Sequence, residues 1–331
     1  MFASHLDKRI DTAEVEQVPS RNGYGEGLRE AGEADERVVA LCADLTESTR
    51  THLFSEAFPE RFVQVGIAEQ NMASVASGMA AMGKVPFIAS YAMFSPGRNW
   101  EQVRTTIAYN DANVKIVGAH AGISVGPDGA THQAIEDMAI MRVIPNMIVI
   151  APADAIEAKK ATLAIAKHVG PVYMRIGREK TPVVTTADSP FTIGKGQWFK
   201  KDEGTSDTET QSVGIVVTGT LAHSALVAAK QLSQSGYRVS VVHMPTIKPL
   251  DTDILNELAA THELIVTVEE HQRIGGLGSA VAEHYTDTTP KRIIRIGVND
   301  EFGQSGTPDE LLTHYGLDSE TIITRVKEQS G

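Results

Sequence analysis

Cysteine is almost absent from this chain of 331 residues, in which Cys42 is the single example. One thiol excludes an internal disulfide and a metal site built from several cysteines. The sequence also lacks any apolar run near the roughly 18 residues that a membrane helix needs. Its first residues do not form the apolar core of a secretory signal. We therefore expect a soluble, cytoplasmic protein with no membrane partner.

Basic residues are scarce relative to acidic ones. Thirty Lys and Arg stand against 42 Asp and Glu, which gives a net charge of −12. A surface this acidic repels phosphate backbones, so nucleic acid is not an expected partner, although a local basic pocket for a small phosphate is allowed. With 42% hydrophobic and 22% charged residues, the composition is that of a globular chain and excludes disordered, collagen-like and coiled-coil proteins.

Short apolar runs alternate with helical patterns in the first half of the chain. The runs are rich in Val, Ile and Met without polar alternation, which is typical of buried parallel strands. They lie at residues 38–43, 114–117, 147–150 and 172–176. Helical patterns occupy residues 71–82, 100–109 and 154–167, and Asp154 is a suitable N-cap for the last of them. This alternation predicts an α/β fold with a parallel sheet.

The pattern changes near residue 190. Residues 191–199 look like one arm of a hairpin, and residues 202–210, which contain no apolar side chain, look like an exposed turn. Further on, strands are predicted at 213–217, 238–242, 264–269 and 293–296, and helices at 222–235, 251–261, 278–284 and 309–315. We expect a first domain at 1–190, a hairpin or linker at 191–212, and a smaller α/β domain at 213–331.

Glu69 is the first candidate for chemistry. It follows the apolar segment 62–65 and opens a helix of small residues from Ala73 to Ala80. A helix start favours negative charge, so an ordinary first-turn glutamate is one interpretation. The helix behind it is too apolar to be a solvated face, however, and a partly desolvated carboxyl group suits proton transfer.

The segment 118–133 is the second candidate. It follows a predicted strand, where open α/β sheets bind ligands, and it holds His120, Asp128 and His132 among four glycines. This set favours a polar pocket over a metal site, because no fourth metal ligand is at hand. Residues 122–126 also match the G-x-S-x-G pattern of serine hydrolases. That motif requires a helix directly after the serine, whereas Ser124 is followed by more loop, so a hydrolase is only an alternative.

Aromatic residues make up 5% of the chain, yet Tyr91, Phe94 and Trp100 fall within ten residues. Such rings beside Gly and Pro can form the wall of a site for a flat heterocycle, while core packing is the alternative that we favour for Trp100. The candidate phosphate clamps, each of which alone is more often a surface residue, are Arg21, Arg98, Arg175 and Arg178. The glycine-rich residues 275–279 open a helix that could bind an anion, but a tight turn is the better interpretation.

Together these segments resemble the thiamine diphosphate enzymes of the transketolase family, most closely the C-terminal subunit of two-chain transketolases. The resemblance extends from about Arg21 to the end of the chain. Its most specific segments are 43–48, 66–72, 91–103, 120–133 and 145–154. It implies a pyrimidine-binding domain followed by a transketolase C-terminal domain. It also implies the transfer of a two-carbon ketol unit from a ketose phosphate to an aldose phosphate.

The resemblance implies roles for the residues around the cofactor. Glu69 would be catalytic and would hydrogen-bond N1′ of the aminopyrimidine, while Tyr91 and Phe94 would pack on that ring. Where single-chain transketolases carry a third aromatic residue, this chain has Gly97 or Arg98. The packing on the ring is therefore expected to differ from theirs.

It also implies roles for the residues around the substrate. His120 and His132 would take part in proton transfer and, together with Asp128, would bind the hydroxyl groups of the sugar. Asp44 would contact the substrate chain or the surroundings of the cofactor. Ala121 stands where single-chain enzymes often have Asp. The residues expected to hold the substrate phosphate are Arg21, Ser48 and Arg178, with His120 nearby.

The diphosphate-binding domain of the family is missing from the sequence. That domain carries a Gly-Asp-Gly motif, followed by an Asn, that binds the metal, and no Gly-Asp-Gly occurs here. The metal, Mg²⁺ or Ca²⁺, is a hard cation that requires oxygen ligands and the diphosphate itself. We therefore expect thiamine diphosphate and its metal to depend on an N-terminal transketolase subunit that carries this domain, in an α2β2 assembly.

Three alternatives remain from the sequence. The beta subunit of a 2-oxoacid dehydrogenase has the same two-domain layout, but the set of His120, Asp128 and His132 favours transketolase. A deoxyxylulose-phosphate synthase-like enzyme is normally a single chain and has an Arg near the position of Ala121. A non-catalytic paralogue is the third alternative, and the retained Glu69 argues against it.

Overall fold

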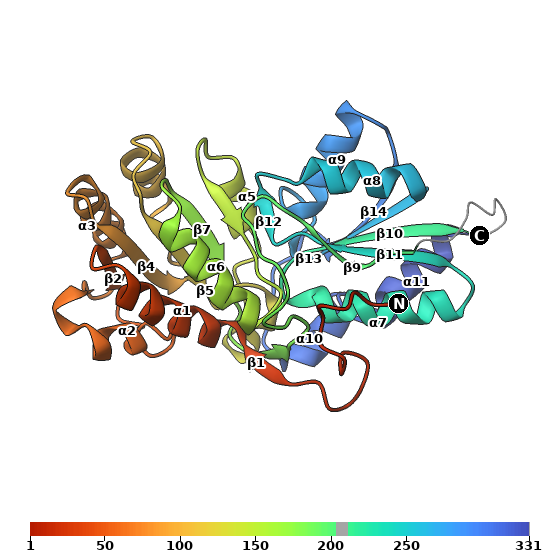
Figure 1. The fold of residues 1–331 in the computed structure, drawn as a ribbon, viewed down its shortest axis with the longest axis horizontal. Coiled ribbons are helices and arrows are strands. Elements are labelled where there is room, and N and C mark those ends of the chain that lie inside the picture. Colours follow the sequence, from red (N-terminus) through yellow and green to blue (C-terminus); the bar gives the residue numbers. More distant parts are fainter. Residues whose placement is uncertain (203–210, 331) are drawn as a thin grey trace.

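The computed structural model describes residues 1–202 and 211–330 (Figure 1). Two sheets lie side by side along the long axis, and helices cover both faces of each sheet. A separate two-stranded sheet pairs β1 (Gln17–Pro19) with β8 (Lys180–Pro182). The predicted α/β class is confirmed.

The first sheet has seven strands and is parallel apart from one edge. In spatial order the strands are β12 (Thr246–Lys248), β6 (Ile148–Ile150), β7 (Val172–Arg175), β5 (Lys115–Ala119), β4 (Val85–Tyr91), β2 (Val38–Cys42) and β3 (Phe62–Gln64). Only β12 runs antiparallel to its neighbour. The four apolar runs of the first half are therefore strands of one sheet, and Cys42 is a buried strand residue as expected.

Helices cover both faces of this first sheet and bury two apolar clusters. One face carries α1 (Ser20–Ala34), α2 (His52–Ala57) and α6 (Ala155–Lys167). The other face carries α3 (Glu69–Ala81), α4 (Trp100–Gln102) and α5 (Asp137–Arg142). The helix predicted at 100–109 is α4 continued by a π-helical segment, Val103–Ala108.

The second sheet has five strands. In spatial order they are β14 (Arg292–Val298), β13 (Leu264–Gln272), β10 (Ser212–Val217), β11 (Arg238–His243) and β9 (Gln197–Lys200). The helices on one face are α7 (Ala222–Gln234), α10 (Pro308–His314) and α11 (Ser319–Ser330), and those on the other are α8 (Thr252–Thr261) and α9 (Leu277–Asp287).

The strand β9 pairs antiparallel with β11 and not with β10, the next strand in the chain. Residues 191–199 are therefore not one arm of a hairpin, which corrects the sequence analysis. Of the turn predicted at 202–210, residues 203–210 lie outside the described residues. The domain limits 1–190, 191–212 and 213–331 remain a prediction.

The two sheets share an interface to which β12 contributes. This strand follows β11 in the chain, yet it completes the edge of the first sheet beside β6. At the same interface, the Glu157 carboxylate lies 2.7 Å from Nε2 of His243 and accepts a hydrogen bond from Gln197 Nε2 at 2.8 Å. All three side chains are buried. Polar groups from both halves thus pair with one another at this interface.

Asp154 is the N-cap of α6, as the sequence predicts. Its Oδ1 accepts the N–H of Glu157 at 3.0 Å and the hydroxyl of Thr185 at 2.7 Å. Its Oδ2 accepts the N–H groups of Val184 and Thr185 at 2.9 and 2.7 Å. Burial raises the pKa of this carboxyl group. One side chain therefore joins the start of α6 to the segment that follows β8.

We expect Asp154→Ala to lower the free energy of unfolding by at least about 3 kcal/mol, since a lost cap costs about 1 kcal/mol and the stranded N–H groups of Val184 and Thr185 cost about 1–3 kcal/mol each. Asp154→Asn keeps one acceptor oxygen, so we expect about half that loss. Urea unfolding of the purified chain measures both. The control is Asp188→Ala at an exposed position, expected within about 0.5 kcal/mol of the wild type. A loss below about 1 kcal/mol in Asp154→Ala would contradict this account.

Candidate active site

The candidate site lies at the carboxyl ends of the strands of the first sheet. Parallel strands end at the same edge, so the residues that follow them converge there. Ser48 follows β2, Tyr91 ends β4, His120 follows β5 and Arg178 follows β7. Arg21 reaches the same place from the first turn of α1.

His120 and Arg21 form the centre of the site. Nη1 of Arg21 lies 2.9 Å from His120 Nε2 and donates to the carbonyl oxygen of Ser48 at 2.9 Å. A guanidinium group can only donate, so His120 Nε2 accepts and the proton of the neutral ring is assigned to Nδ1. His120 is 2% exposed, and burial followed by the charge of Arg21 lowers its pKa to about 3. This imidazole is therefore neutral.

Two donors of this centre have no partner. His120 Nδ1 and Arg21 Nε are buried and make no hydrogen bond to any residue that the structure describes. Burial, and then the neighbouring guanidinium groups of Arg50 and Arg178, lower the pKa of Arg21. Unsatisfied buried donors among clustered positive charges fit an oxygen-rich anion. Arg50 belongs to none of the sequence motifs, so its place in this cluster emerges only from the fold.

Aromatic rings predicted for the cofactor, Tyr91 and Phe94, lie together with two predicted for the sugar, His120 and His132. Tyr91 stacks on His120 with ring centroids 4.0 Å apart and planes 19° from parallel. Phe94 lies 6.0 Å from Tyr91 in a stacked arrangement, and His132 meets Phe94 edge-on at 5.5 Å. Four of the predicted site residues thus form one aromatic wall, which is suited to the face of a flat ring.

Glu69 is buried at the start of α3, as expected for a helix-start carboxylate in apolar surroundings. Its side chain is 1% exposed, and Oε2 lies 2.7 Å from Nη1 of Arg98, whose side chain is 46% exposed. The Arg98 guanidinium also lies 4.7 Å from the ring centroid of Phe94. Arg98 is therefore the ion-pair partner of Glu69, which corrects its interpretation as a phosphate clamp.

Asp128 and Asp44 occupy different surroundings. Arg178 donates to the carbonyl oxygen of Val125 at 2.6 Å and lies 3.6 Å from the Asp128 carboxylate. Asp44 is exposed, and its N–H donates to Gln64 Oε1 at 2.8 Å. These contacts bring Asp128 to the arginine cluster, whereas they do not join Asp44 to it.

Two other sequence interpretations are resolved by the structure. Ser124 lies in a 3-10 segment, Ile123–Asp128, that is interrupted at Gly126, so no strand–serine–helix turn forms and the hydrolase alternative loses its structural basis. Arg175 is buried and its Nε donates to Asp137 Oδ2 at 3.0 Å. It is therefore an internal ion-pair residue and not a phosphate clamp.

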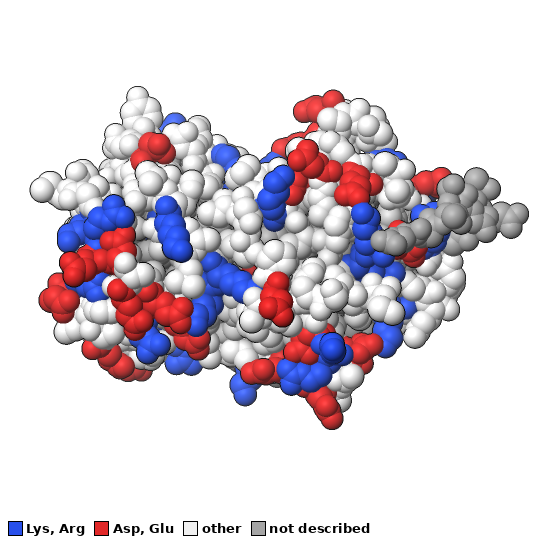
Figure 2. All heavy atoms as spheres, viewed as in Figure 1, with Lys and Arg blue, Asp and Glu red and all other residues white. Residues whose placement is uncertain are grey.

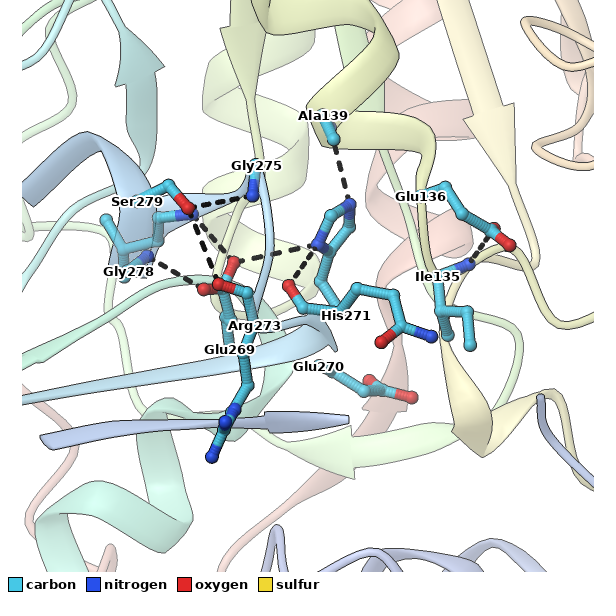
Figure 3. Close-up of polar contacts among 12 residues, drawn as sticks. Ile135, Glu136, Ala139, Glu269, Glu270, His271, Arg273, Gly275, Gly278 and Ser279 are labelled. Atoms are coloured by element: carbon cyan, nitrogen blue, oxygen red, sulfur yellow. Dashed lines mark hydrogen bonds and ion pairs between the residues drawn. The ribbon is translucent and has the colours of Figure 1, made fainter. Parts of the chain in front are cut away.

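The helix start after residues 275–276 is already satisfied from within the chain. The N–H groups of Leu277 and Gly278 both donate to the Glu269 carboxylate at 2.7 Å. Figure 3 shows Gly278 beside this carboxylate. A carboxylate therefore takes the place that an external anion would occupy. This agrees with the interpretation of residues 275–279 as a turn.

The described residues offer no group of three or more His, Cys, Asp or Glu placed to hold a metal ion. Within the same residues, no helix is long and apolar enough to cross a bilayer. On the face shown in Figure 2, acidic and basic side chains are interspersed. The cationic group formed by Arg21, Arg50 and Arg178 is thus a local feature of an acidic chain.

Comparison with known proteins places both halves of the chain in one family. Residues 16–183 match the family model of the transketolase pyrimidine-binding domain, and residues 202–322 match that of the transketolase C-terminal domain. A chain of Methanocaldococcus jannaschii, assigned as a transketolase C-terminal section, is 46% identical over 93% of this chain and 95% of its own length. A 6-deoxy-6-sulfo-D-fructose transketolase subunit of Clostridium sp. strain MSTE9 is 38% identical over 93% of each chain.

A solved structure is similar over nearly the whole chain. It is a split-gene transketolase in an inactive beta4 tetramer, with a TM-score of 0.85 and 42% identity. The match covers 94% of this chain and 98% of that one. The resemblance inferred from the sequence is confirmed by these comparisons.

His120 generates a prediction on pH. Unfolded histidine takes up a proton near pH 6.5, whereas folded His120 does so near pH 3, so stability is lost as the pH falls between these values. His120→Asn removes this contribution. Between about pH 6 and pH 4, we expect the stability of His120→Asn to fall less steeply with decreasing pH than that of the wild type. The two slopes should differ by up to about 1.4 kcal/mol per pH unit. Urea unfolding across this range measures the difference.

The same variant identifies the His120 ring signals in NMR spectra. We expect the signal that disappears in His120→Asn to be one that does not titrate in the wild type above about pH 4.5. Equal slopes of stability against pH in both proteins, or titration of that signal near pH 6.5, would show that the ring is not held neutral by its site.

Proposed function

The chain belongs to the transketolase family, and we propose that it is the C-terminal subunit of a two-chain transketolase that transfers a two-carbon ketol unit from a ketose phosphate to an aldose phosphate. One observation carries this proposal. The unpartnered buried donors of Arg21 and His120 lie beside an aromatic wall, among positive charges. A phosphorylated sugar supplies both the oxygen acceptors and the negative charge that this arrangement lacks.

The site fits one end of thiamine diphosphate. The buried Glu69 carboxylate accepts a hydrogen bond, and Tyr91 and Phe94 offer ring faces, which suits an aminopyrimidine. Arg98 now pairs with Glu69, and because its side chain is half exposed it is free to turn toward solvent. When bound, the cofactor supplies the carbon centre that carries the two-carbon unit.

The other end of the cofactor requires another chain. The described residues hold no cluster that would bind Mg²⁺ or Ca²⁺, and the family uses a divalent metal with the diphosphate. We propose that an N-terminal transketolase subunit carries the diphosphate-binding domain and that the two subunits form an α2β2 assembly. The similar split-gene transketolase, whose beta subunits alone form an inactive tetramer, supports this division of labour.

The residues of this chain would act mainly by holding the sugar. Arg21 and Arg178 would bind the phosphate, with the Ser48 carbonyl fixing the Arg21 guanidinium. The neutral His120 would donate from Nδ1 to a sugar oxygen, since its Nε2 is taken by Arg21. His132, which meets Phe94 edge-on, would exchange protons with the hydroxyl groups of the same sugar.

The arginine cluster also weighs against the nearest alternative. A short 2-oxoacid carries one carboxylate next to its reacting carbonyl and has no distant phosphate to place, so a beta subunit of a 2-oxoacid dehydrogenase does not need this cluster. The relative named for 6-deoxy-6-sulfo-D-fructose indicates that a sulfonate is a second terminal anion to test.

Reconstitution with the N-terminal subunit, thiamine diphosphate and Mg²⁺ tests the proposal. The wild-type complex is expected to transfer ketol units from a ketose phosphate and not to decarboxylate pyruvate. Glu69→Gln removes the charge that contacts the cofactor, so we expect kcat to fall by about 10²–10⁴-fold. The control is Glu33→Gln, an exposed position on α1, with unchanged activity. Activity on pyruvate alone would refute the function, and full activity of Glu69→Gln would refute the role of that residue.

Arg178 gives a separate prediction on substrate binding. Arg178→Ala removes a charge-assisted hydrogen bond to the phosphate, so we expect KM for the ketose phosphate to rise by about 10–100-fold with a smaller change in kcat. A sulfonated ketose should show the same loss, whereas a ketose without a terminal anion should change by less than about threefold. Arg29→Ala, at an exposed position of α1, is the control. Equal losses for charged and uncharged ketoses would contradict a phosphate-binding role.

A further inference from the structure

The site loop, defined here as residues 122–133, is held by a carboxylate from the second sheet. Glu270, near the end of β13, accepts the N–H of Ser124 at 2.6 Å through Oε1. Its Oε2 accepts the hydroxyl of Thr220 at 2.8 Å. Glu270 is 5% exposed. Figure 3 shows that its carboxylate points away from Glu269, the neighbouring residue that satisfies the start of α9.

The loop has space for this carboxylate because Gly122 has no side chain. A Cβ atom at Gly122 would lie 2.3 Å from Glu270 Oε1, well inside contact distance. Gly122 also has a φ of 91°, which residues with a side chain rarely adopt. Its N–H donates to the carbonyl oxygen of Ala134 at 2.8 Å, so the start of the loop is tied to the residue that follows its end.

Arg175 makes hydrogen bonds to the backbone of both Glu270 and Ala134. It donates to the backbone carbonyl of Glu270 at 2.9 Å through Nη1 and to that of Ala134 at 3.2 Å through Nη2. Its Nε is paired with the buried Asp137. The backbone that carries Glu270 is therefore fixed relative to both ends of the loop.

The C-terminal end of the site loop is also attached to the second half of the chain, through Gln133. Nε2 of Gln133 donates to the carbonyl oxygens of Ile123 and Gln304, each at 3.0 Å. The amide thus closes the loop on itself and attaches it to residues that precede α10. Like the contact of Glu270, this one joins the two halves of the chain.

Ordering this loop has a free-energy cost that such ties must offset. The loop contains Gly122, Gly126 and Gly129, which lose more conformational freedom on folding than other residues. A buried N–H that donates to a carboxylate forms a stronger bond than one that donates to a neutral acceptor. Removing the carboxylate would leave the Ser124 N–H without a partner and release the start of the loop.

We propose that Glu270 is a positioning residue for ketol transfer, which fixes the site loop at Ser124 and so sets the places of Asp128 and His132 relative to the sugar. This inference rests on the proposed function. Glu270 does not itself reach the reacting groups, because both of its oxygens are used within the protein. Through this side chain, the second half of the chain holds the active-site loop of the first half in place.

The test compares Glu270→Ala with Glu270→Gln. The amide oxygen of Gln can still accept the Ser124 N–H, and its amino group can donate to the Thr220 hydroxyl. Glu283→Ala is the matched control, because Glu283 also makes a contact between the two halves, an ion pair with Arg142, that does not involve the site loop. Hydrogen–deuterium exchange of the isolated chain reports on the loop, and the reconstituted complex reports on catalysis.

For Glu270→Ala we expect exchange of residues 122–133 to speed up by about 10-fold or more, and kcat/KM for the ketose phosphate to fall by about 10–100-fold. Glu270→Gln should restore both to within about fivefold of the wild type. Affinity for the N-terminal subunit should not change in any variant. Glu283→Ala should leave both loop exchange and kcat/KM unaltered.

Unchanged loop exchange and unchanged kcat/KM in a folded Glu270→Ala variant would overturn the proposal, as would the same losses in Glu283→Ala. If Glu270→Ala does not fold, Thr220→Val replaces it, since that change removes the donor to Oε2 and should speed loop exchange by about 2–5-fold. If the wild-type complex shows no ketol transfer, the proposed function fails. Loop exchange in the isolated chain then still decides whether Glu270 orders the loop.

Discussion

The buried guanidinium of Arg175 is the constraint on which the site depends. It ends β7 inside the molecule, where a lone charge would be costly, and it is balanced by Asp137, which also accepts the hydroxyl of Tyr173 at 2.6 Å. Its other two guanidinium nitrogens donate to the carbonyl oxygens of Glu270 and Ala134. Because each of these bonds fixes a different segment, the first sheet, the end of the site loop and β13 cannot shift independently.

The centre of the site contains positive charges that lie close together, and an anionic ligand would stabilise them. The Arg21 guanidinium is repelled by those of Arg50 and Arg178, and His120 is held neutral beside Arg21. His120, Arg50 and Asp44 also have positive φ values of 54°, 66° and 59°, and such backbone strain is typical of functional sites. The surrounding sheet supplies the stability that keeps these groups in place. An anion that reached the cluster would gain from charges that are already oriented, so little further ordering would oppose its binding.

The sequence predicted those features whose cause is local. The buried apolar runs form strands and Asp154 caps α6, as predicted, because both features depend on residues close together in the sequence. The strand β4 was missed because Pro86 interrupts its apolar pattern, and Pro is rare in central strands. The partners of Arg98 and Arg175 were not predictable in this way. Arg98 pairs with a residue 29 positions away, and Arg175 contacts Glu270 across 95 positions, so only the folded chain reveals them.

Long-range pairing also bears on the proposed cofactor site. Glu69 is buried while Arg98 is half exposed, so the pair can open from its solvent side and leave a carboxylate against a wall of rings. A buried carboxylate without a partner is unstable, and a ring nitrogen that donates to it would replace the lost ion pair. The opposite end of such a ligand would carry a diphosphate and a metal, for which the described residues provide no ligand cluster. In the proposed assembly, the second subunit would therefore supply the ligands for the diphosphate and the metal, which the described residues of this chain lack.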